Sequence, residues 1–383
     1  MTTTPTPETL RKKEIVVLGA GVIGLTAAYK LQLQDTYKVT IVSEIIPSDP
    51  KSIKYTSRWA GGHHVYNPIN ETEQHLFEEQ TFDVMWALSA PGSDAEECFL
   101  RVPQTEYFFT EEPKPNPMEK MPNFKRLNAD ELIPGALSGC TFTTVTIDVP
   151  IYLNYLLMRF LAAGGRVVRG SLQHIYPLLE AGTNLFAEGN KHDPVPDAVI
   201  NCTGLGARVL GGVEDKDVFP VRGQTVLVRA PWVRFGRTET LDHTGAFTYI
   251  IPRRSSDVIV GGTRGINDWF PRPRPEITED ILRRGLKLCP ELAPPEIRAI
   301  REPTLEDLLP LVVGEGCGLR PARKGGLRLE VEWIDGALVK RDGKVPIVHN
   351  YGHGGFGYQA SWGCANRVVE LLDAALGVSK AKI

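Results

Sequence analysis

A glycine-rich turn between an apolar run and a helical segment constrains this chain more than any other feature. Residues 14–18 (EIVVL) predict a buried strand and residues 22–33 predict a helix, with Gly19, Gly21 and Gly24 between and within them in the pattern GxGxxG. The first glycine allows the tight turn, the second lets a pyrophosphate approach the backbone, and the third permits close helix–strand packing. The phosphates would lie at the helix N-terminus, where free N–H groups and the helix dipole favour an anion.

The segment that follows completes a βαβ unit. Residues 38–42 (KVTIV) predict a second strand, and Glu44 follows it closely, 20 residues after Gly24. A carboxylate at this place accepts hydrogen bonds from ribose hydroxyls and disfavours a 2′-phosphate. The agreement of strand, helix, second strand and acid favours a dinucleotide site over a glycine turn that binds nothing. The motif alone leaves NAD and FAD open.

A second glycine-rich segment lies near the end of the chain. Residues 351–357 (YGHGGFG) run directly into a predicted amphipathic helix over residues 359–376. A helix N-terminus directed at a reduced flavin supplies donors and a positive dipole end for its negative charge. Glycines also let a flat ring approach the backbone. The alternative is a loop that only closes the fold, but together the two glycine segments favour FAD.

Composition limits the class of protein. The chain has 383 residues, 42 % of them hydrophobic, which predicts roughly two globular units. A net charge of −3 and the lack of a long apolar run give no reason to expect a nucleic-acid or membrane partner. The six cysteines form no CxxC or Cys/His spacing, so we expect free thiols and no metal site.

The predicted elements alternate between two types along the chain. Helical patterns cover residues 73–88, 148–163 and 278–288, short strands cover 166–168 and 198–201, antiparallel strands fill 223–260, a loop covers 268–275, and a hairpin is expected over 319–331. This order predicts a mixed α/β fold in which a Rossmann-like FAD-binding domain is interleaved with an antiparallel-sheet substrate domain. We expect the first to contain residues 1–60, 148–210 and 335–383, and the second, which also forms the interface, to contain 61–147 and 211–334.

Six motifs carry a resemblance to a known family. GAGVIGLTAAYKL, RWAGGHH, NCTGLGA, YIIPR, GLRPAR and YGHGGFGYQASWGCA occur in this order between residue 15 and about residue 370. As an ordered set they resemble the FAD-dependent D-amino acid oxidase family, which includes the D-aspartate oxidases. The resemblance implies noncovalently held FAD and oxidative deamination of D-amino acids by molecular oxygen to 2-oxo acids, ammonia and hydrogen peroxide.

The resemblance also implies which residues hold the cofactor. In the first turn, at the end of the second strand and in the loop over the flavin these are Gly19, Ala20, Gly21, Val22, Ile23, Gly24, Glu44, Ser57, Arg58, Ala60, Gly61, Gly62 and His63. In the later segments they are Leu172, which would meet the adenine through its backbone, and Thr203, Gly354, Gly355, Phe356, Gly357, Tyr358 and Gln359. We interpret His63 and His64 as packing or hydrogen-bonding groups, because they lie in no metal-binding pattern.

The substrate site follows from the same resemblance. Arg320 would pair with the α-carboxylate, which suits a planar guanidinium that donates two parallel hydrogen bonds. The hydroxyl of Tyr249 would contact the same carboxylate, the carbonyl of Gly355 would hold the amine, and Gln359 would lie near flavin and substrate. Arg323 is expected to be structural. No acid–base or nucleophile set appears, and hydride transfer from the α-carbon to flavin N5 requires none.

One position departs from the pattern of many fungal members, which have tyrosine after GGT. This chain has Arg264 there, as members that act on D-aspartate do. Arg264 would therefore widen specificity toward acidic substrates, or it would pair locally with Asp268 or Asp242. Neutral D-amino acids are the first expectation, with D-aspartate oxidase and glycine or N-methyl amino acid oxidase as alternatives. A nucleotide-binding protein that senses without catalysis is disfavoured by Arg320 and Tyr249 in their motifs.

Two expectations concern the cell and the assembly. The C-terminal Ala381-Lys-Ile383 is close to a peroxisomal address but ends in isoleucine, so peroxisomal housing is expected and a cytoplasmic location is the alternative. The family is often dimeric, so a homodimer is expected alongside the small-molecule partners, a D-amino acid and oxygen.

Overall fold

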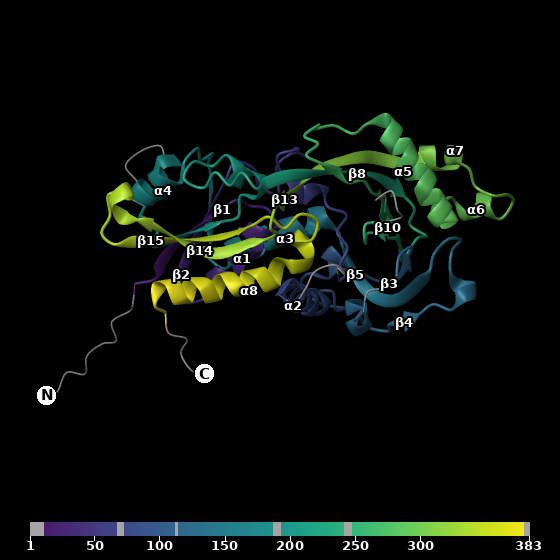
Figure 1. Cartoon of the computed structure of the whole chain (residues 1–383), viewed down its shortest axis with the longest axis horizontal. Coiled ribbons are helices and arrows are strands. Elements are labelled where there is room, and N and C mark those ends of the chain that lie inside the picture. The colour runs from purple at the N-terminus through teal and green to yellow at the C-terminus, as the bar shows by residue number, and fades with distance from the viewer. Residues whose placement is uncertain (1–10, 67–72, 112–113, 187–192, 241–246, 379–383) are drawn as a thin grey trace.

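The strands of the protein form two sheets that lie one after the other along its long axis (Figure 1). The structure is a computed structural model and describes residues 11–66, 73–111, 114–186, 193–240 and 247–378. No helix in these ranges is both long enough and apolar enough to span a bilayer.

The first sheet is the dinucleotide-type half. Its order is β14 (Arg328–Asp335), β15 (Lys344–Tyr351), β7 (Ala198–Asn201), β1 (Lys13–Leu18), β2 (Tyr37–Ser43) and β6 (Arg166–Arg169). All neighbouring pairs are parallel except β14 with β15. A parallel sheet covered on both faces requires strands that are apolar throughout, which explains the continuous run in β1.

Helices cover both faces of this sheet. Ile15 and Val17 pack into one core with α1 (Val22–Gln32), α3 (Val149–Ala162) and α8 (Gly357–Leu376), whereas Val16 and Leu18 pack into another with α4 (Ile175–Ala181). Helix α2 (Glu73–Leu88) packs against α8, and Figure 1 shows α8 running along one side of the sheet. The Gly19 turn and the N-terminus of α8 both lie where the strands end.

The second sheet has nine strands and is mostly antiparallel. Its order is β12 (Gly265–Ile266), β8 (Val218–Arg229), β11 (Asp257–Gly261), β10 (Thr248–Pro252), β9 (Gly236–Glu239), β3 (Phe99–Phe108), β5 (Ser138–Ile147) and β4 (Lys125–Arg126), with β13 (Val312–Arg323) paired to β8. Only β3 and β9 pair in parallel.

The two faces of this sheet differ in chemistry. Val226, Ile250 and Val260 pack under α5 (Pro275–Leu288), which is followed by α6 (Pro295–Arg298) and α7 (Leu305–Leu308). Their neighbours Thr225 and Tyr249 point to the opposite face and line a cavity. Strand alternation thus gives one apolar face to the core and one polar face to the site.

The elements expected from the first βαβ unit, the 73–88 helix and the C-terminal helix are present to within a few residues. The expected hairpin over 319–331 is wrong. Its two halves belong to different sheets, because β13 pairs along β8 whereas β14 pairs with β15. Strand β14, which the sequence division places almost wholly in the second unit, is therefore part of the first sheet.

Candidate active site

One cavity of about 610 Å³ connects the two sheets. Its walls contain most of the residues expected from the sequence: Gly19, Ala20, Gly21, Val22, Ile23, Glu44, Ser57, Ala60, Gly61, Gly62, His63, Thr203, Tyr249, Arg320, Gly354, Gly355, Phe356, Gly357, Tyr358 and Gln359. Residues from four distant parts of the sequence therefore meet in one space, with the first sheet at one end and the second sheet at the other.

The glycines of the first turn are required by contact geometry. Gly19 has a φ of +98°, and a Cβ there would lie 2.7 Å from the carbonyl oxygen of Cys202. A Cβ on Gly24 would lie 1.9 Å from the carbonyl oxygen of Gly19, so only glycine lets α1 start this close to β1. Gly24 therefore acts through packing and does not line the cavity.

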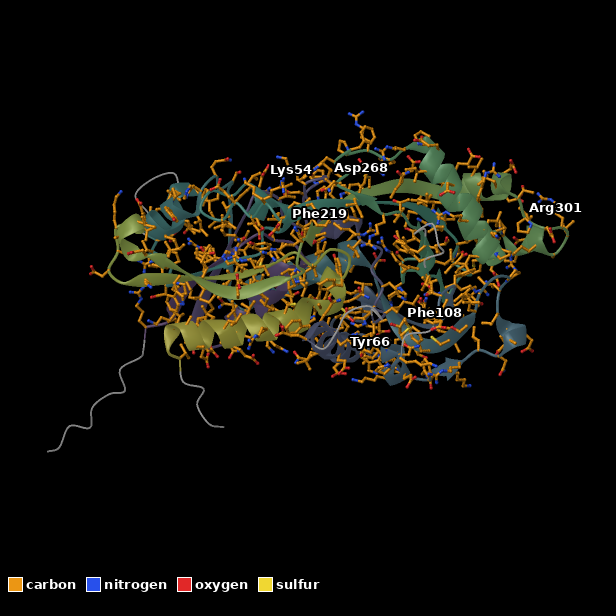
Figure 2. All side chains as sticks on the ribbon, in the orientation of Figure 1. Lys54, Tyr66, Phe108, Phe219, Asp268 and Arg301 are labelled. Atoms are coloured by element: carbon orange, nitrogen blue, oxygen red, sulfur yellow. The ribbon has the colours of Figure 1, made fainter. Side chains whose placement is uncertain are left out.

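The N-terminus of α1 is open toward the cavity. The backbone N–H of Val22 donates to Ser57 Oγ at 3.0 Å, and that hydroxyl belongs to the 3₁₀ turn Thr56–Trp59. Ser57 thus lies against the helix start, where an anionic group is favoured. At the edge of the cavity Lys54 Nζ donates to Glu44 Oε1 at 2.9 Å. Figure 2 shows Lys54 near the middle of the long axis, between the two halves of the protein.

The second glycine segment forms a cradle at the start of α8. A Cβ on Gly354 or Gly355 would meet no atom closer than 3.8 Å, so these positions present bare backbone to open space. The hydroxyl of Tyr358 donates to the Ser57 carbonyl at 2.8 Å and ties this segment to the loop from the first half. The side chain of Gln359 donates to the carbonyl of Val65.

At the other end of the cavity Arg320 and Tyr249 lie over glycines. The Arg320 guanidinium covers Gly223, where a Cβ would lie 2.4 Å from its Nη1, and that atom donates to the Thr263 carbonyl at 3.0 Å. The ring of Tyr249 covers Gly261 in the same way. Burial raises the pKa of Tyr249 and the charge of Arg320 opposes this rise, so the phenol is a neutral donor at pH 7.

A family model described as FAD dependent oxidoreductase matches residues 14–371. The chain belongs to this family. A D-aspartate oxidase of Cryptococcus neoformans var. grubii is 36 % identical and covers 95 % of this chain and 97 % of its own. A D-amino-acid oxidase of Fusarium vanettenii is 34 % identical over 96 % of this chain and 99 % of its own. Among solved structures, a glycine oxidase from Geobacillus kaustophilus has the same fold, with a TM-score of 0.70 at 17 % identity and 95 % coverage of both chains.

The cavity of this FAD-dependent oxidoreductase fits its cofactor. The carboxamide of Asn350 lines the cavity with both its oxygen and its nitrogen buried and without a partner among the described residues. Nε2 of His63 and Nε2 of His353 are in the same condition, and burial lowers the pKa of each ring to about 3, so both rings are neutral. Buried polar atoms require partners, and the carbonyl and ring-nitrogen groups of a flavin can provide them.

Besides Gly24, three expected site residues of the oxidoreductase lie outside the cavity wall. Arg58 donates to the carbonyls of Pro47 and Asp49, so it shapes the loop from behind. Leu172 packs beside the core under α4 and does not line the cavity. Arg264 is exposed and does not line it either.

The local partner expected for Arg264 is also corrected. The carboxylate of Asp268 is bound instead by Arg274, at 2.6 and 3.2 Å, and Asp242 lies outside the described residues. Arg323, expected to be structural, pairs with Asp215 at 2.7 Å. His64 is fully buried, with Nε2 3.2 Å from the Gln359 carbonyl, which matches the packing interpretation, whereas His63 is half-buried and lines the cavity.

Five polar residues of the wall were not expected from the sequence: Glu106, Thr225, Thr238 and Thr240 in the substrate half, and Asn350 on β15 of the first sheet. The signal for Glu106 was available in the run Gln104-Thr-Glu106. Polar residues two apart within an otherwise apolar strand lie on one face, and here that face is buried.

Proposed function

We propose that the protein is a D-amino acid oxidase, which converts a D-amino acid, oxygen and water into a 2-oxo acid, ammonia and hydrogen peroxide. The observation that carries the proposal is that Arg320 and Tyr249 line the same cavity as the glycine cradle at the start of α8, in a chain of an FAD-dependent family. Relatives named D-amino-acid oxidase, 34 % identical along nearly the whole chain, support it.

The residues of this chain provide position and electrostatics. Arg320 binds the α-carboxylate through its guanidinium, and Tyr249 donates to the same group from the neighbouring wall. The Gly355 carbonyl accepts from the neutral amine, which leaves the α-hydrogen as the group to be removed. FAD supplies the redox chemistry when bound, by accepting a hydride from the α-carbon at N5 and passing the electrons to oxygen.

The test is an assay of the purified, FAD-loaded protein with D-alanine, D-methionine and D-phenylalanine and their L-enantiomers. We expect hydrogen peroxide and the matching 2-oxo acid in equal amounts from the D-forms only. Glycine and N-methylglycine serve as the test of the related amine oxidases. A higher kcat/KM for these two than for every D-amino acid would overturn the proposal.

A second candidate is an oxidase of acidic D-amino acids, which is favoured by the similarity to a D-aspartate oxidase and by arginine at position 264. The exposed Arg264 would have to turn into the cavity to meet a side-chain carboxylate. Comparison of D-aspartate with D-alanine in the wild type and in Arg264→Ala decides between the two. Loss of D-aspartate activity alone in the variant would favour the second candidate.

We also propose a peroxisomal homodimer. Hydrogen peroxide production gives a reason for peroxisomal housing, and the signal at 381–383 lies outside the described residues. Ile266 at the end of β12 and Trp269 and Phe270 in the loop that follows are 60, 50 and 44 % exposed, an apolar surface suited to a second copy. Figure 2 shows Asp268 of this loop at the upper margin of the protein. Fluorescence microscopy of a fusion protein with and without residues 381–383 tests the peroxisomal location. Light scattering of the purified protein tests the homodimer.

A further inference from the structure

A buried carboxyl group faces the substrate half of the cavity. Glu106 is 3 % exposed and lies on β3. It is in register with Thr238 on β9, and Thr238 is in register with Tyr249 on β10. Register partners on neighbouring strands point to the same face of a sheet. Glu106, Thr238 and Tyr249 therefore form one row across three strands, and all three line the cavity.

The row determines how far Glu106 lies from Tyr249, which together with Arg320 would bind the α-carboxylate. Neighbouring strands are about 4.8 Å apart, so the backbone of Glu106 lies roughly 10 Å from that of Tyr249. An extended side chain of lysine length spans about 6 Å from its α-carbon. A substrate whose α-carboxylate is held by Arg320 and Tyr249 can therefore direct the end of a long side chain to Glu106.

The carboxyl group has capacity for a further donor. Gln104 Nε2 donates to Glu106 Oε1 at 2.7 Å, and the Thr238 hydroxyl also hydrogen-bonds to the carboxylate. A carboxylate offers about four acceptor sites on its two oxygens. Among the described residues no ion pair of 4.0 Å or less joins Glu106 to a lysine, arginine or histidine, and Arg237, which precedes Thr238 on β9, is paired with Glu291. Burial without a counter-cation raises the pKa of Glu106 to about 7.

The chemistry of this position favours one class of substrate. A buried carboxylate without a cation is costly, and a cationic group on the substrate removes that cost. A second carboxylate at the same place would be repelled. The arginine that would balance an acidic side chain, Arg264, lies outside the wall.

We infer that Glu106 is a specificity-determining residue that favours D-amino acids with a cationic side chain, of the lysine and arginine class, by accepting a hydrogen bond from the side-chain ammonium or guanidinium. The inference deepens the proposed function and rests on it.

The test compares D-lysine with D-norleucine, which has the same carbon chain without the ammonium group, and with D-glutamate, all at pH 8. In the wild-type holoenzyme kcat/KM is expected to fall in the order D-lysine, D-norleucine, D-glutamate. In Glu106→Gln the ratio of D-lysine to D-norleucine is expected to fall about 10-fold or more through the KM for D-lysine, because a charge-assisted hydrogen bond is lost. D-norleucine is expected to change by less than about 3-fold, since it makes no contact with the charge.

The matched control is Glu330→Gln, an exposed carboxylate on β14 outside the cavity, which is expected to leave the ratio unchanged. The ratio within one preparation cancels losses of folded protein, and Glu106→Asp, which keeps the charge, is expected to keep the preference for D-lysine. A wild type that prefers D-norleucine to D-lysine, or a ratio that Glu106→Gln leaves within about 3-fold, overturns the inference while the oxidase activity stands. Failure of every D-amino acid, D-alanine included, overturns the proposed function itself.

Discussion

At the cofactor end the cavity wall is mostly backbone, whereas at the substrate end it is mostly side chains. Gly354 and Gly355 leave space into which a flat ring can fit, and Gly19 allows the tight turn that opens the N-terminus of α1 to a pyrophosphate. Tyr249, Arg320 and Glu106 instead project charged and hydrogen-bonding groups from a sheet. The two ends should therefore fail in different ways: a change at the first should remove the cofactor, and a change at the second should alter the substrate.

The largest effect is expected from Gly24→Ala. The new methyl group would lie 1.9 Å from the Gly19 carbonyl oxygen, so α1 must move away from the turn that it supports. We expect a loss of stability of about 3 kcal/mol or more and loss of bound FAD. The flavin-to-protein absorbance ratio and the thermal midpoint measure this. Gly314→Ala is the control, because a Cβ there meets nothing within 4 Å, and an equal loss in both variants would contradict the packing role.

The next effect is expected from Arg320→Ala, at the substrate end. Loss of a bidentate contact to the α-carboxylate should raise KM about 100-fold or more, since each of its two hydrogen bonds to a charged group contributes about 1.5–3 kcal/mol. The flavin spectrum should stay unchanged, because the glycine cradle is intact. Arg264→Ala, an exposed arginine, should leave KM for D-alanine as it is. An unchanged KM in Arg320→Ala would refute the carboxylate role.

The pH dependence of folding stability tests the buried carboxyl group of Glu106 at the substrate end. Its pKa of about 7 in the folded chain lies above the value in an unfolded chain, so the folded form holds a proton more tightly and stability falls as pH rises from about 4.5 to 7. In Glu106→Gln this fall is removed. Between pH 5 and pH 8 the variant should therefore gain stability relative to the wild type, by at most about 3 kcal/mol. Denaturant unfolding at the two pH values measures it, and a constant difference would show that Glu106 is already ionised at pH 5.

The smallest effect is expected from Tyr249→Phe. The ring still covers Gly261 and Gly262, so folding and FAD content should be kept, while one hydrogen bond to the substrate is lost. We expect KM to rise about 3- to 10-fold, as for a bond of about 1 kcal/mol. Steady-state kinetics with D-alanine check this. A change of flavin content instead of KM would place Tyr249 in the cofactor half.

The cofactor end of the site could be predicted from the sequence more fully than the substrate end. The cofactor end depends on local patterns, because a glycine turn between β1 and α1 or before α8 is a matter of neighbouring residues. The substrate end depends on strand register, which brings Glu106, Thr238 and Tyr249 into one row over 143 residues of sequence. The spacing of Gln104 and Glu106 indicates locally that both lie on one face of a strand, but only the register shows that this face lies beside Tyr249 in the cavity.

The remaining errors have the same cause. The Gly325-Gly326 turn indicates a hairpin locally, but its two strands find longer partners in β8 and β15 and so enter different sheets. Arg264 follows a recognisable motif, yet the direction of its side chain depends on the loop that follows β11. The resemblance identified Arg320 and Tyr249 as the residues that would bind the α-carboxylate. The residues around the substrate side chain could be identified only from the structure.

We conclude that a D-amino acid held at the substrate end of the cavity is oxidised by FAD held at the cofactor end. Anaerobic reduction of the bound flavin is the most direct test. Purified holoenzyme is mixed with D-methionine or L-methionine without oxygen, and the visible flavin bands are followed. We expect rapid bleaching by the D-form only, and bleaching that needs far more substrate in Arg320→Ala. Bleaching by both enantiomers alike, or by neither, would contradict it.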